Sequence, residues 1–154
     1  MHDVQIVPAT REHIVAILPY VRQADILEFL AVTGQTPEQV LELGLRVSTF
    51  ACAGLINGHA VTIFGVAPAS MIGGCGLPWL VSTDALEQYP RTFLRQCRPV
   101  VDVFLSVYPR LENYVDTRNH VAIAWLRWLG FRLEEPAPYG MLGLPFHRFH
   151  LERK

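Results

Sequence analysis

The sequence predicts a mixed α/β protein in which helices flank a central mixed β-sheet. Predicted helices and strands follow one another in the order β-helices-β-β-β-α-β-α-β-β. Asn57-Gly58 joins two β-branched, apolar runs, which is the strongest short-range signal for a hairpin. An apolar helical run near the end of the chain stops at Gly130-Phe131. With 154 residues the chain can bury a substantial core, and we expect one domain over 1–154.

The first four elements are a strand and three helices, expected at 4–7, 11–18, 20–32 and 37–47. The β-branched run VQIV forms the strand, and Thr10 is suited to cap the helix that follows it. Pro19 interrupts the helical pattern, and Gly34 supplies a left-handed end for the second helix. Thr36 as cap, with Pro37 at the first helical position, begins the third helix.

The remaining elements are expected at 48–56, 59–67 and 71–81 (strands), 89–108 (helix), 111–115 (strand), 119–129 (helix), and 131–135 and 145–151 (strands). The first two strands form the hairpin, and Pro78 indicates a bulge or an edge in the third. Pro99 should kink the long helix, and Asn119 should cap the last one. A Pro/Gly-rich loop, PAPYGMLGLP, separates the two closing strands.

Composition excludes several classes of function. A net charge of −1 gives no basic field for binding nucleic acid. Apolar runs end well before the roughly 18 residues that a membrane span requires. Cys52, Cys75 and Cys97 are widely spaced, as in a protein with reduced thiols in the cytosol. His147 and His150 are three apart in a predicted strand, so they point to opposite faces and we expect no metal site.

The long helix carries a row of arginines. Arg91, Arg95 and Arg98 recur at i, i+4 and i+7 and therefore share one face. Two of them lie in the first turns, where the helix dipole and free N–H groups already attract anions. The functional interpretation is a phosphate-bearing ligand. The alternative is a solvated face neutralised by nearby acids such as Asp84 and Glu87.

The second helix also places charges together. Arg22, Asp25 and Glu28 recur at i, i+3 and i+6, on one side of the helix. They could bind an amine substrate and supply a base, or they could form an exposed, salt-bridged face. Such faces are the commoner arrangement, so the pattern by itself favours the exposed face.

One segment is similar to a known family. NHVAIAWLRWLGF, residues 119–131, with the element order before it, resembles the GNAT acyltransferase fold. There an Asn-x-x-Ala-Ile helix ending in Leu-Gly-Phe closes the acyl-CoA site. Nearly the whole chain also resembles a phage family that includes internal virion protein A of short-tailed phages and acetyltransferase-like phage proteins. The similar segments are RQADILEF, TGQTPEQVLELGLRVS, IFGVAP, PWLVSTDAL, FLRQCR, YPRLENYVDTRN and AWLRWLGF.

The resemblance implies acetyl-CoA or another acyl-CoA as the cofactor, and no metal. The cofactor-binding residues that it implies are Trp79, Leu80 and Val81 on the strand, Arg91, Thr92 and Arg95 on the long helix, and Asn119. The family holds the pyrophosphate on a glycine-rich turn, whereas EQYPRTFLR at 87–95 contains no glycine. Arginine side chains would have to replace those backbone contacts.

The resemblance leaves the catalytic groups open. Many GNAT enzymes carry an acidic tyrosine seven positions after the helix asparagine, and that position is Leu126 here. Tyr139 is the candidate acid, and Glu28 is the candidate base ahead of Asp25 and Asp84.

The substrate and partners follow from the same resemblance. Arg22 and Asp25 would contact an amine acceptor, either a small molecule or a protein. Two functions therefore remain: an N-acetyltransferase, or a catalytically degenerate module that binds other virion proteins, with a place in the host cytoplasm or the virion. A separation of LPWLV from LENYV would admit the pantetheine arm, whereas a closed sheet would not.

Overall fold

The computed structural model describes residues 3–69 and 72–154. The strands are β1 (Val4–Pro8), β2 (Phe50–Ile56), β3 (His59–Pro68), β4 (Cys75–Ser82), β5 (Arg110–Asp116), β6 (Arg132–Leu133), β7 (Ala137–Tyr139) and β8 (Leu144–Glu152). The α-helices are α1 (Arg11–Ile17), α2 (Gln23–Val32), α3 (Pro37–Val47), α4 (Pro90–Val107) and α5 (His120–Trp128). Two short 3-10 helices are η1 (Leu18–Tyr20) and η2 (Asp84–Gln88).

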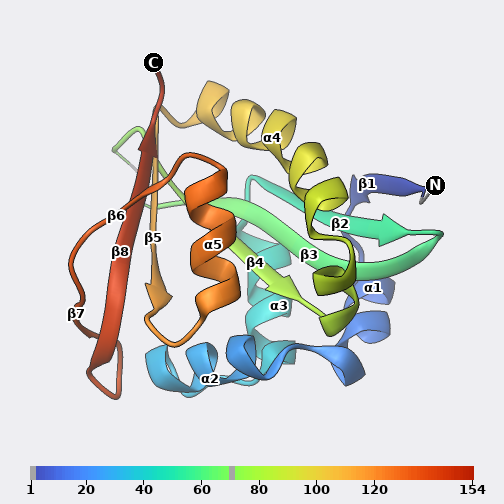
Figure 1. Ribbon diagram of the computed structural model, residues 1–154, viewed down its shortest axis with the longest axis horizontal. Coiled ribbons are helices and arrows are strands. Elements are labelled where there is room, and N and C mark those ends of the chain that lie inside the picture. The colour runs from blue at the N-terminus through green and yellow to red at the C-terminus, as the bar shows by residue number, and fades with distance from the viewer. Residues whose placement is uncertain (1–2, 70–71) are drawn as a thin grey trace.

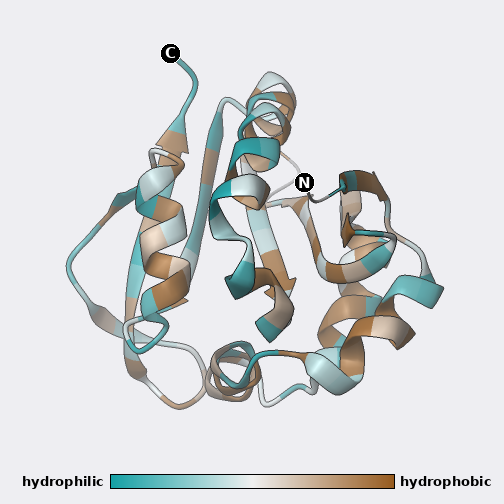
Figure 2. Cartoon of the chain, turned by 45° about the vertical axis from the view of Figure 1, so that its right-hand side comes forward, coloured by the Kyte–Doolittle hydropathy of each residue, from teal (hydrophilic) through white to brown (hydrophobic). Residues whose placement is uncertain are grey.

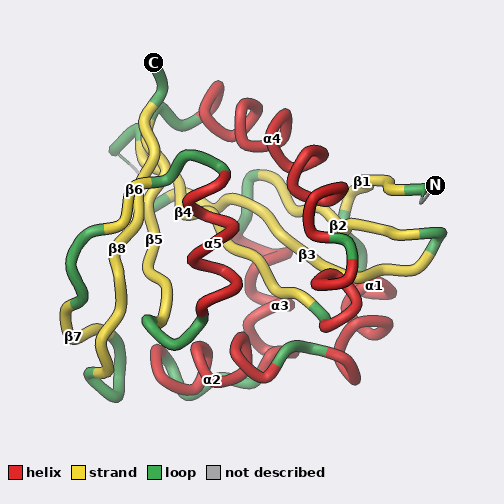
Figure 3. Tube along the Cα trace, in the orientation of Figure 1, coloured by secondary structure: helices red, strands yellow, loops and turns green. Residues whose placement is uncertain are grey.

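The strands form one mixed sheet in the order β1-β2-β3-β4-β5-β8-β6, and β7 pairs with β8 outside that path. All pairs are antiparallel except β4 with β5. Helices α4 and α5 cover one face, and α1 and α3 cover the other (Figures 1 and 3). Helix α2 runs across the ends of β4 and β5 (Figure 1). The predicted fold class, a mixed sheet flanked by helices, is confirmed.

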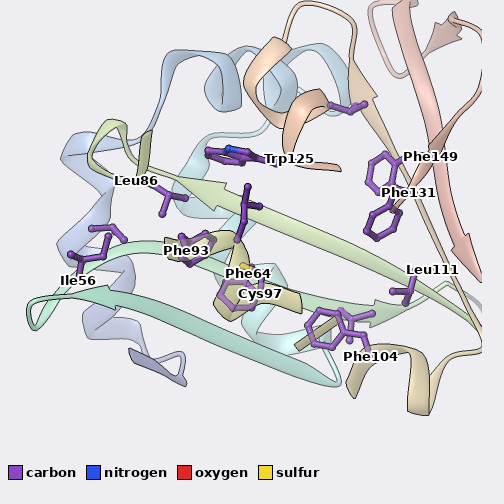
Figure 4. Packing of buried hydrophobic residues seen from close by; sticks show 14 residues of the cluster. Ile56, Phe64, Leu86, Phe93, Cys97, Phe104, Leu111, Trp125, Phe131 and Phe149 are labelled. Carbon is purple, nitrogen blue, oxygen red and sulfur yellow. The ribbon is translucent and has the colours of Figure 1, made fainter. Parts of the chain in front are cut away.

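The two faces of the sheet bury separate apolar clusters because neighbouring residues of a strand point to opposite sides. On β3, Ile63 packs towards α1 and α3, whereas Phe64 packs towards α4. Phe131 and Phe149 lie edge to face near β8 in the larger cluster, with ring centroids 5.3 Å apart (Figure 4). The helices mix hydrophobic and hydrophilic residues, as expected for elements with one buried face (Figure 2).

The local signals at turns and caps are confirmed. Asn57 and Gly58 both have positive φ, 51° and 82°, as a two-residue hairpin turn requires. Gly130 (φ 98°) follows α5, where we expected a left-handed residue. The side chain of Thr36 accepts from the Gln39 N–H in a full capping box at the start of α3.

Several boundaries differ from the prediction. Helix α2 begins at Gln23, not at residue 20, because Leu18–Tyr20 forms a tight 3-10 turn around the proline. Strand β4 begins at Cys75, and residue 71, where we expected its start, lies outside the described residues. The strand expected at 131–135 keeps only Arg132–Leu133. The loop after it contains β7, whose three residues pair with β8.

No helix within 3–69 or 72–154 is long and apolar enough to cross a membrane.

Candidate acyl-CoA and acceptor site

Strands β4 and β5 start together and then separate. They pair in parallel only at Cys75 with Arg110 and at Gly76 with Leu111. Beyond this point β4 continues against β3 as far as Ser82, and β5 continues against β8. The two strands therefore face each other across a widening gap in the middle of the sheet, visible in Figure 1. LPWLV and LENYV are therefore separated, which is the arrangement that we expected to admit a pantetheine arm.

The narrow end of the gap is bridged by one side chain. Asn113 Nδ2, on β5, donates a 2.9 Å hydrogen bond to the carbonyl oxygen of Pro78 on β4. The backbone of Pro78 pairs with β3 on one side and with no strand on the other, so Pro78 occupies an edge-like position. The expectation of an edge or bulge at this proline holds for the side that faces the gap.

The wide end is closed by α2. The Ser82 N–H donates to Asp25 Oδ2 over 2.9 Å, and the Ser82 carbonyl accepts from the Arg22 N–H over 2.9 Å. Backbone groups of alternate residues in a strand point to the same side. Pro78 and Ser82 both direct backbone groups into the gap, so the N–H and C=O of Leu80 between them also face it. Leu80 thus offers the backbone pair to which a ligand can bind.

A cavity of about 340 Å³ passes through this gap, from the side of α2 to the side of α4 and α5. On the α2 side its walls include Glu28, Phe29, Val32, Gln35, Val40, Trp79, Tyr114 and Tyr139. On the other side they include Leu80, Phe93, Leu94, Cys97, Asn119, Ala122, Trp125 and Leu126. Most of the lining is apolar, and the carboxylates among its residues are Asp25 and Glu28.

Glu28 is the group best suited to accept a proton. Its Oε1 accepts from the Asp116 N–H (3.0 Å) and from Asn119 Nδ2 (2.9 Å). No hydrogen bond from the described residues reaches Oε2, which leaves that oxygen for a ligand. Burial raises the pKa of Glu28 to about 7, despite the lowering effect of the two hydrogen bonds. A carboxyl with this pKa exchanges its proton near neutral pH.

Arg22 and Asp25 are buried, so the interpretation of the helix charges as an exposed face is wrong. Arg22 Nη2 donates to Asn119 Oδ1 over 2.9 Å, and its Nε lies 2.9 Å from a carboxylate oxygen of Glu87. The guanidinium also lies over the Trp125 ring, 5.4 Å from the centroid. Burial raises the pKa of Asp25 to about 6, although Arg22 opposes the rise. The spacing of the three charged residues placed them on one side of the helix. Whether that side is buried depends on the packing of α2 against the ends of β4 and β5, which the spacing does not show.

Asn119 connects these groups. It caps α5 by accepting from the Ala122 N–H, while the same Oδ1 accepts from Arg22 and Nδ2 donates to Glu28. The predicted cap is confirmed. Its side chain lines the cavity but is almost fully engaged within the protein, and its clearest role is to position Glu28 and Arg22.

In the arginine row of α4, Arg98 contacts α5. Arg98 donates to the Trp128 carbonyl over 2.9 Å and lies 4.6 Å from the centroid of its ring. Arg91 and Arg95 are exposed on the same helical face and form no ion pair with any described residue. The expected neutralising partner Glu87 pairs with Arg22 instead.

A groove separates the first turns of α4 and α5, and it is lined by Glu87, Pro90, His120, Val121, Ala124 and Trp125. Arg91 follows Pro90 in the sequence, but neither Arg91 nor Arg95 is among the residues that line the groove. Thr92 is exposed and does not line the groove.

Two tyrosines form part of the α2-side wall. The rings of Tyr114 and Tyr139 stack with centroids 3.7 Å apart. Burial, and to a lesser extent Tyr114, raises the pKa of Tyr139, so its phenol keeps its proton at neutral pH. Leu126 lines the same cavity and carries no proton to donate. Within the described ranges no three His, Cys, Asp or Glu side chains are grouped to hold a metal ion.

Several solved structures that share this fold are described as N-acetyltransferases. A spermidine N-acetyltransferase from Vibrio cholerae, in complex with CoA and spermine, matches with a TM-score of 0.71 at 10% identity, over 97% of this chain and 95% of that one. A GCN5-related N-acetyltransferase from Kribbella flavida matches at 0.72 and 19% identity, over 97% and 98%. A ribosomal-protein-alanine N-acetyltransferase from Brucella melitensis matches at 0.70 and 18%, over 97% and 99%.

The chain has the GNAT acetyltransferase fold. Comparison of the sequence with protein-family models and with curated proteins gives no match. The structural neighbours support the GNAT part of the sequence resemblance, and they provide no link to phage proteins.

Within the GNAT fold, sequence reasoning missed several residues that shape the site. It did not identify Asn113, which bridges β4 and β5, or Ser82, whose backbone binds α2. It also missed Tyr114, the partner of Tyr139. The alternating pattern of β5 could have placed Asn113 and Tyr114 on opposite faces, but no local signal indicates that β4 leaves β5 beside them.

Proposed function

We propose that this GNAT-fold protein transfers an acyl group, most simply acetyl, from acyl-CoA to the nitrogen of an amine. The observation that supports the proposal best is the cavity between β4 and β5, which joins the Leu80 backbone to the carboxylate of Glu28. One neighbour with this fold was crystallised with CoA and an amine, spermine. The same pairing of ligands would place a thioester in the gap and an amine on the α2 side.

The fit to acyl-CoA differs along the length of the ligand. The apolar gap suits a pantetheine arm, and the unpaired Leu80 C=O can accept a hydrogen bond from an amide N–H of that arm. The Leu80 N–H then stays available for the acyl oxygen. The phosphates would lie in the groove between α4 and α5, close to Arg91 and Arg95. Because η2 and the start of α4 contain no glycine, side chains take the part that backbone N–H groups play on a glycine-rich turn.

An acyl-CoA supplies an acyl carbon activated as a thioester. The bound ammonium first passes one proton through Glu28 Oε2 to water, which leaves a neutral amine with a free lone pair. The amine nitrogen then forms a bond to the acyl carbon as Glu28 Oε2 takes a second proton from it, and the carbon–sulfur bond breaks. Tyr139 gives its phenolic proton to the departing sulfur, so the products are an amide and the CoA thiol. The Leu80 N–H stabilises the negative charge that develops on the acyl oxygen. Exchange with water returns Glu28 to the carboxylate and Tyr139 to the phenol.

Thermal unfolding with acetyl-CoA and CoA tests binding, and release of CoA thiol in the presence of an amine tests transfer. A ligand at about 100 times its Kd should stabilise the protein by roughly 2.7 kcal/mol. Tyr139→Phe keeps the stacked ring and removes the acid, so turnover should fall while acetyl-CoA binding persists. Unfolding that is unchanged by millimolar acetyl-CoA and CoA would contradict the proposal.

A second candidate is a binding module of the phage type that keeps the fold without turnover. It is favoured by the Glu87 carboxylate, which lies in the groove where phosphates would bind. It also agrees with the hydrogen bonds that already occupy the Ser82 backbone, whose N–H donates to Asp25 and whose carbonyl accepts from the Arg22 N–H. This candidate predicts no release of CoA thiol with any amine, and co-purification with phage structural proteins.

A further inference from the structure

The α2 side of the cavity, where the amine acceptor would bind, is mostly aromatic and carries few charged groups. Its walls are mainly the rings of Phe29, Trp79, Tyr114 and Tyr139, together with Val32 and Val40, and two uncharged polar residues, Thr33 and Gln35, also line it. Among residues 3–69 and 72–154, no Lys, Arg or His side chain lines the cavity. An amine that enters from the α2 side therefore meets ring faces and aliphatic surface before it reaches a carboxylate.

The aromatic wall is fixed in place. Trp79 Nε1 donates to Ser48 Oγ over 2.8 Å, so the polar atom of the indole is already satisfied. Its ring lies against two glycines, since a Cβ at Gly44 or Gly65 would come within 2.9 Å or 3.0 Å of Trp79 Cζ2. Together with the stacked tyrosines, this gives a rigid apolar surface that loses little entropy when a flat ligand binds.

The charge available to a ligand is limited to one site. Asp25 is bound to Arg22 and to the Ser82 N–H, so it is neutralised within the protein. Glu28 Oε2 is the remaining carboxylate oxygen that can receive an ammonium group. A polyamine would place its second and third charges against apolar walls, where unpaired charges are costly.

We propose that the preferred acceptor is an arylalkylamine, a primary amine with a single charge and an aromatic ring, whose ammonium binds Glu28 Oε2 while its ring packs on the wall formed by Phe29, Trp79 and Tyr114. This inference rests on the acyl-transfer function proposed above. It assigns to this chain an acceptor class different from the spermine bound by the Vibrio cholerae neighbour.

The test compares 2-phenylethylamine with spermidine, butylamine and the neutral isostere 2-phenylethanol. Direct binding to the full chain without acyl-CoA is measured by calorimetry, and kcat/KM is measured with acetyl-CoA. Burial of the ring predicts at least about a tenfold preference for 2-phenylethylamine over butylamine and spermidine in both measurements. The alcohol should bind more weakly than 2-phenylethylamine, and Glu28→Gln should remove most of the difference.

Two substitutions test how the walls of the cavity determine the preferred acceptor. Phe29→Leu should weaken binding of 2-phenylethylamine more than that of butylamine. Gln35 lines the cavity and accepts from Thr33 Oγ1 over 3.2 Å, a bond that Gln35→Glu can keep. The added carboxylate should shift the preference towards spermidine, because the second charge then has a partner.

The outcomes separate this inference from the proposed function. Acylation of spermidine with a kcat/KM equal to or above that of 2-phenylethylamine would refute the acceptor class and leave acyl transfer intact. Binding of 2-phenylethylamine that depends on Glu28, without acylation of any amine, would support the ligand class and refute acyl transfer. If 2-phenylethylamine neither binds nor reacts, the acceptor class is wrong.

Discussion

Asn119 Nδ2 donates a 2.9 Å hydrogen bond to Glu28 Oε1, although the two residues are 91 positions apart in the sequence. Through this bond the cap of α5 holds the carboxylate of α2 at the wide end of the gap between β4 and β5. The same asparagine accepts from Arg22, so one side chain orients both the proposed base and the buried cation.

Asn119→Asp should raise the pKa of Glu28 above its value of about 7. The aspartate can still cap α5 and accept from Arg22, but it replaces the donor to Glu28 with a like charge. A pH titration of the Glu28 side-chain carboxyl by NMR measures the effect. Asn119→Ala also loses the cap and should lower the free energy of unfolding by about 1–3 kcal/mol. A Glu28 pKa that is unchanged in Asn119→Asp would refute the positioning role.

Stability should fall as the pH rises from about 4.5, the ordinary pKa of the Glu28 carboxyl, to about 7, its pKa in the folded protein. In this window the folded state holds a proton that the unfolded chain has lost, so unfolding becomes easier with rising pH. Above about pH 7 the full cost of the buried charge is present. Glu28→Gln carries no such charge, and its stability should decline less over the same window. The free energy of unfolding, measured in urea at each pH, gives this comparison. If it fell equally steeply with pH in the wild type and in Glu28→Gln, the assignment of the raised pKa to Glu28 would be contradicted.

Arg22→Met should destabilise the protein by about 3–5 kcal/mol at pH 8, because Asp25 is then left buried without its cation. The loss should be smaller below about pH 6, where Asp25 takes up a proton. The matched control is Glu87→Gln, which removes a half-exposed partner of the same arginine and should cost at most about 1 kcal/mol. Urea unfolding at both pH values provides the measurement.

Arg91→Ala combined with Arg95→Ala should weaken binding of acetyl-CoA by about ten- to a hundredfold, as expected for the loss of charged hydrogen bonds to phosphate. Binding of S-acetylpantetheine, which lacks the diphosphate, should not change. Arg46→Ala, an exposed arginine in the last turn of α3, is the control. Calorimetric titration distinguishes these cases, and equal affinity of the double variant and the wild type for acetyl-CoA would place the phosphates elsewhere.

The sequence predicted the sheet and most helix ends because these depend on local chemistry: the positive φ of Asn57-Gly58, the Thr36 capping box and the apolar strands. The cap at Asn119 and the left-handed end at Gly130 predicted the helix between them, since both signals are encoded within a few residues. The fold itself was indicated by the resemblance of residues 119–131 to GNAT proteins. Strand β7 was missed because three residues with Pro138 among them carry no alternating signal, and only pairing with β8 makes them a strand.

The sequence offered a set of candidate site residues, but it did not predict how the structure arranges them. Spacing placed Arg22, Asp25 and Glu28 on one side of a helix, yet it could not show that this side is buried. The pKa of Glu28 is raised by burial, which depends on the packing of α2 against segments far along the chain, including those that carry Asp116 and Asn119. Long-range packing of this kind leaves no periodic trace in a single sequence.

The pH dependence of kcat/KM for acetyl transfer to 2-phenylethylamine, in the wild type and in Glu28→Gln, tests the central claim most directly. The account predicts an acid limb with an apparent pKa of about 7 in the wild type, since Glu28 must lose its proton before it can accept one from the amine. In Glu28→Gln the rate should be much lower and this limb should be absent. A wild-type rate and an unchanged limb in Glu28→Gln would contradict the assignment of this carboxylate as the base in the gap between β4 and β5.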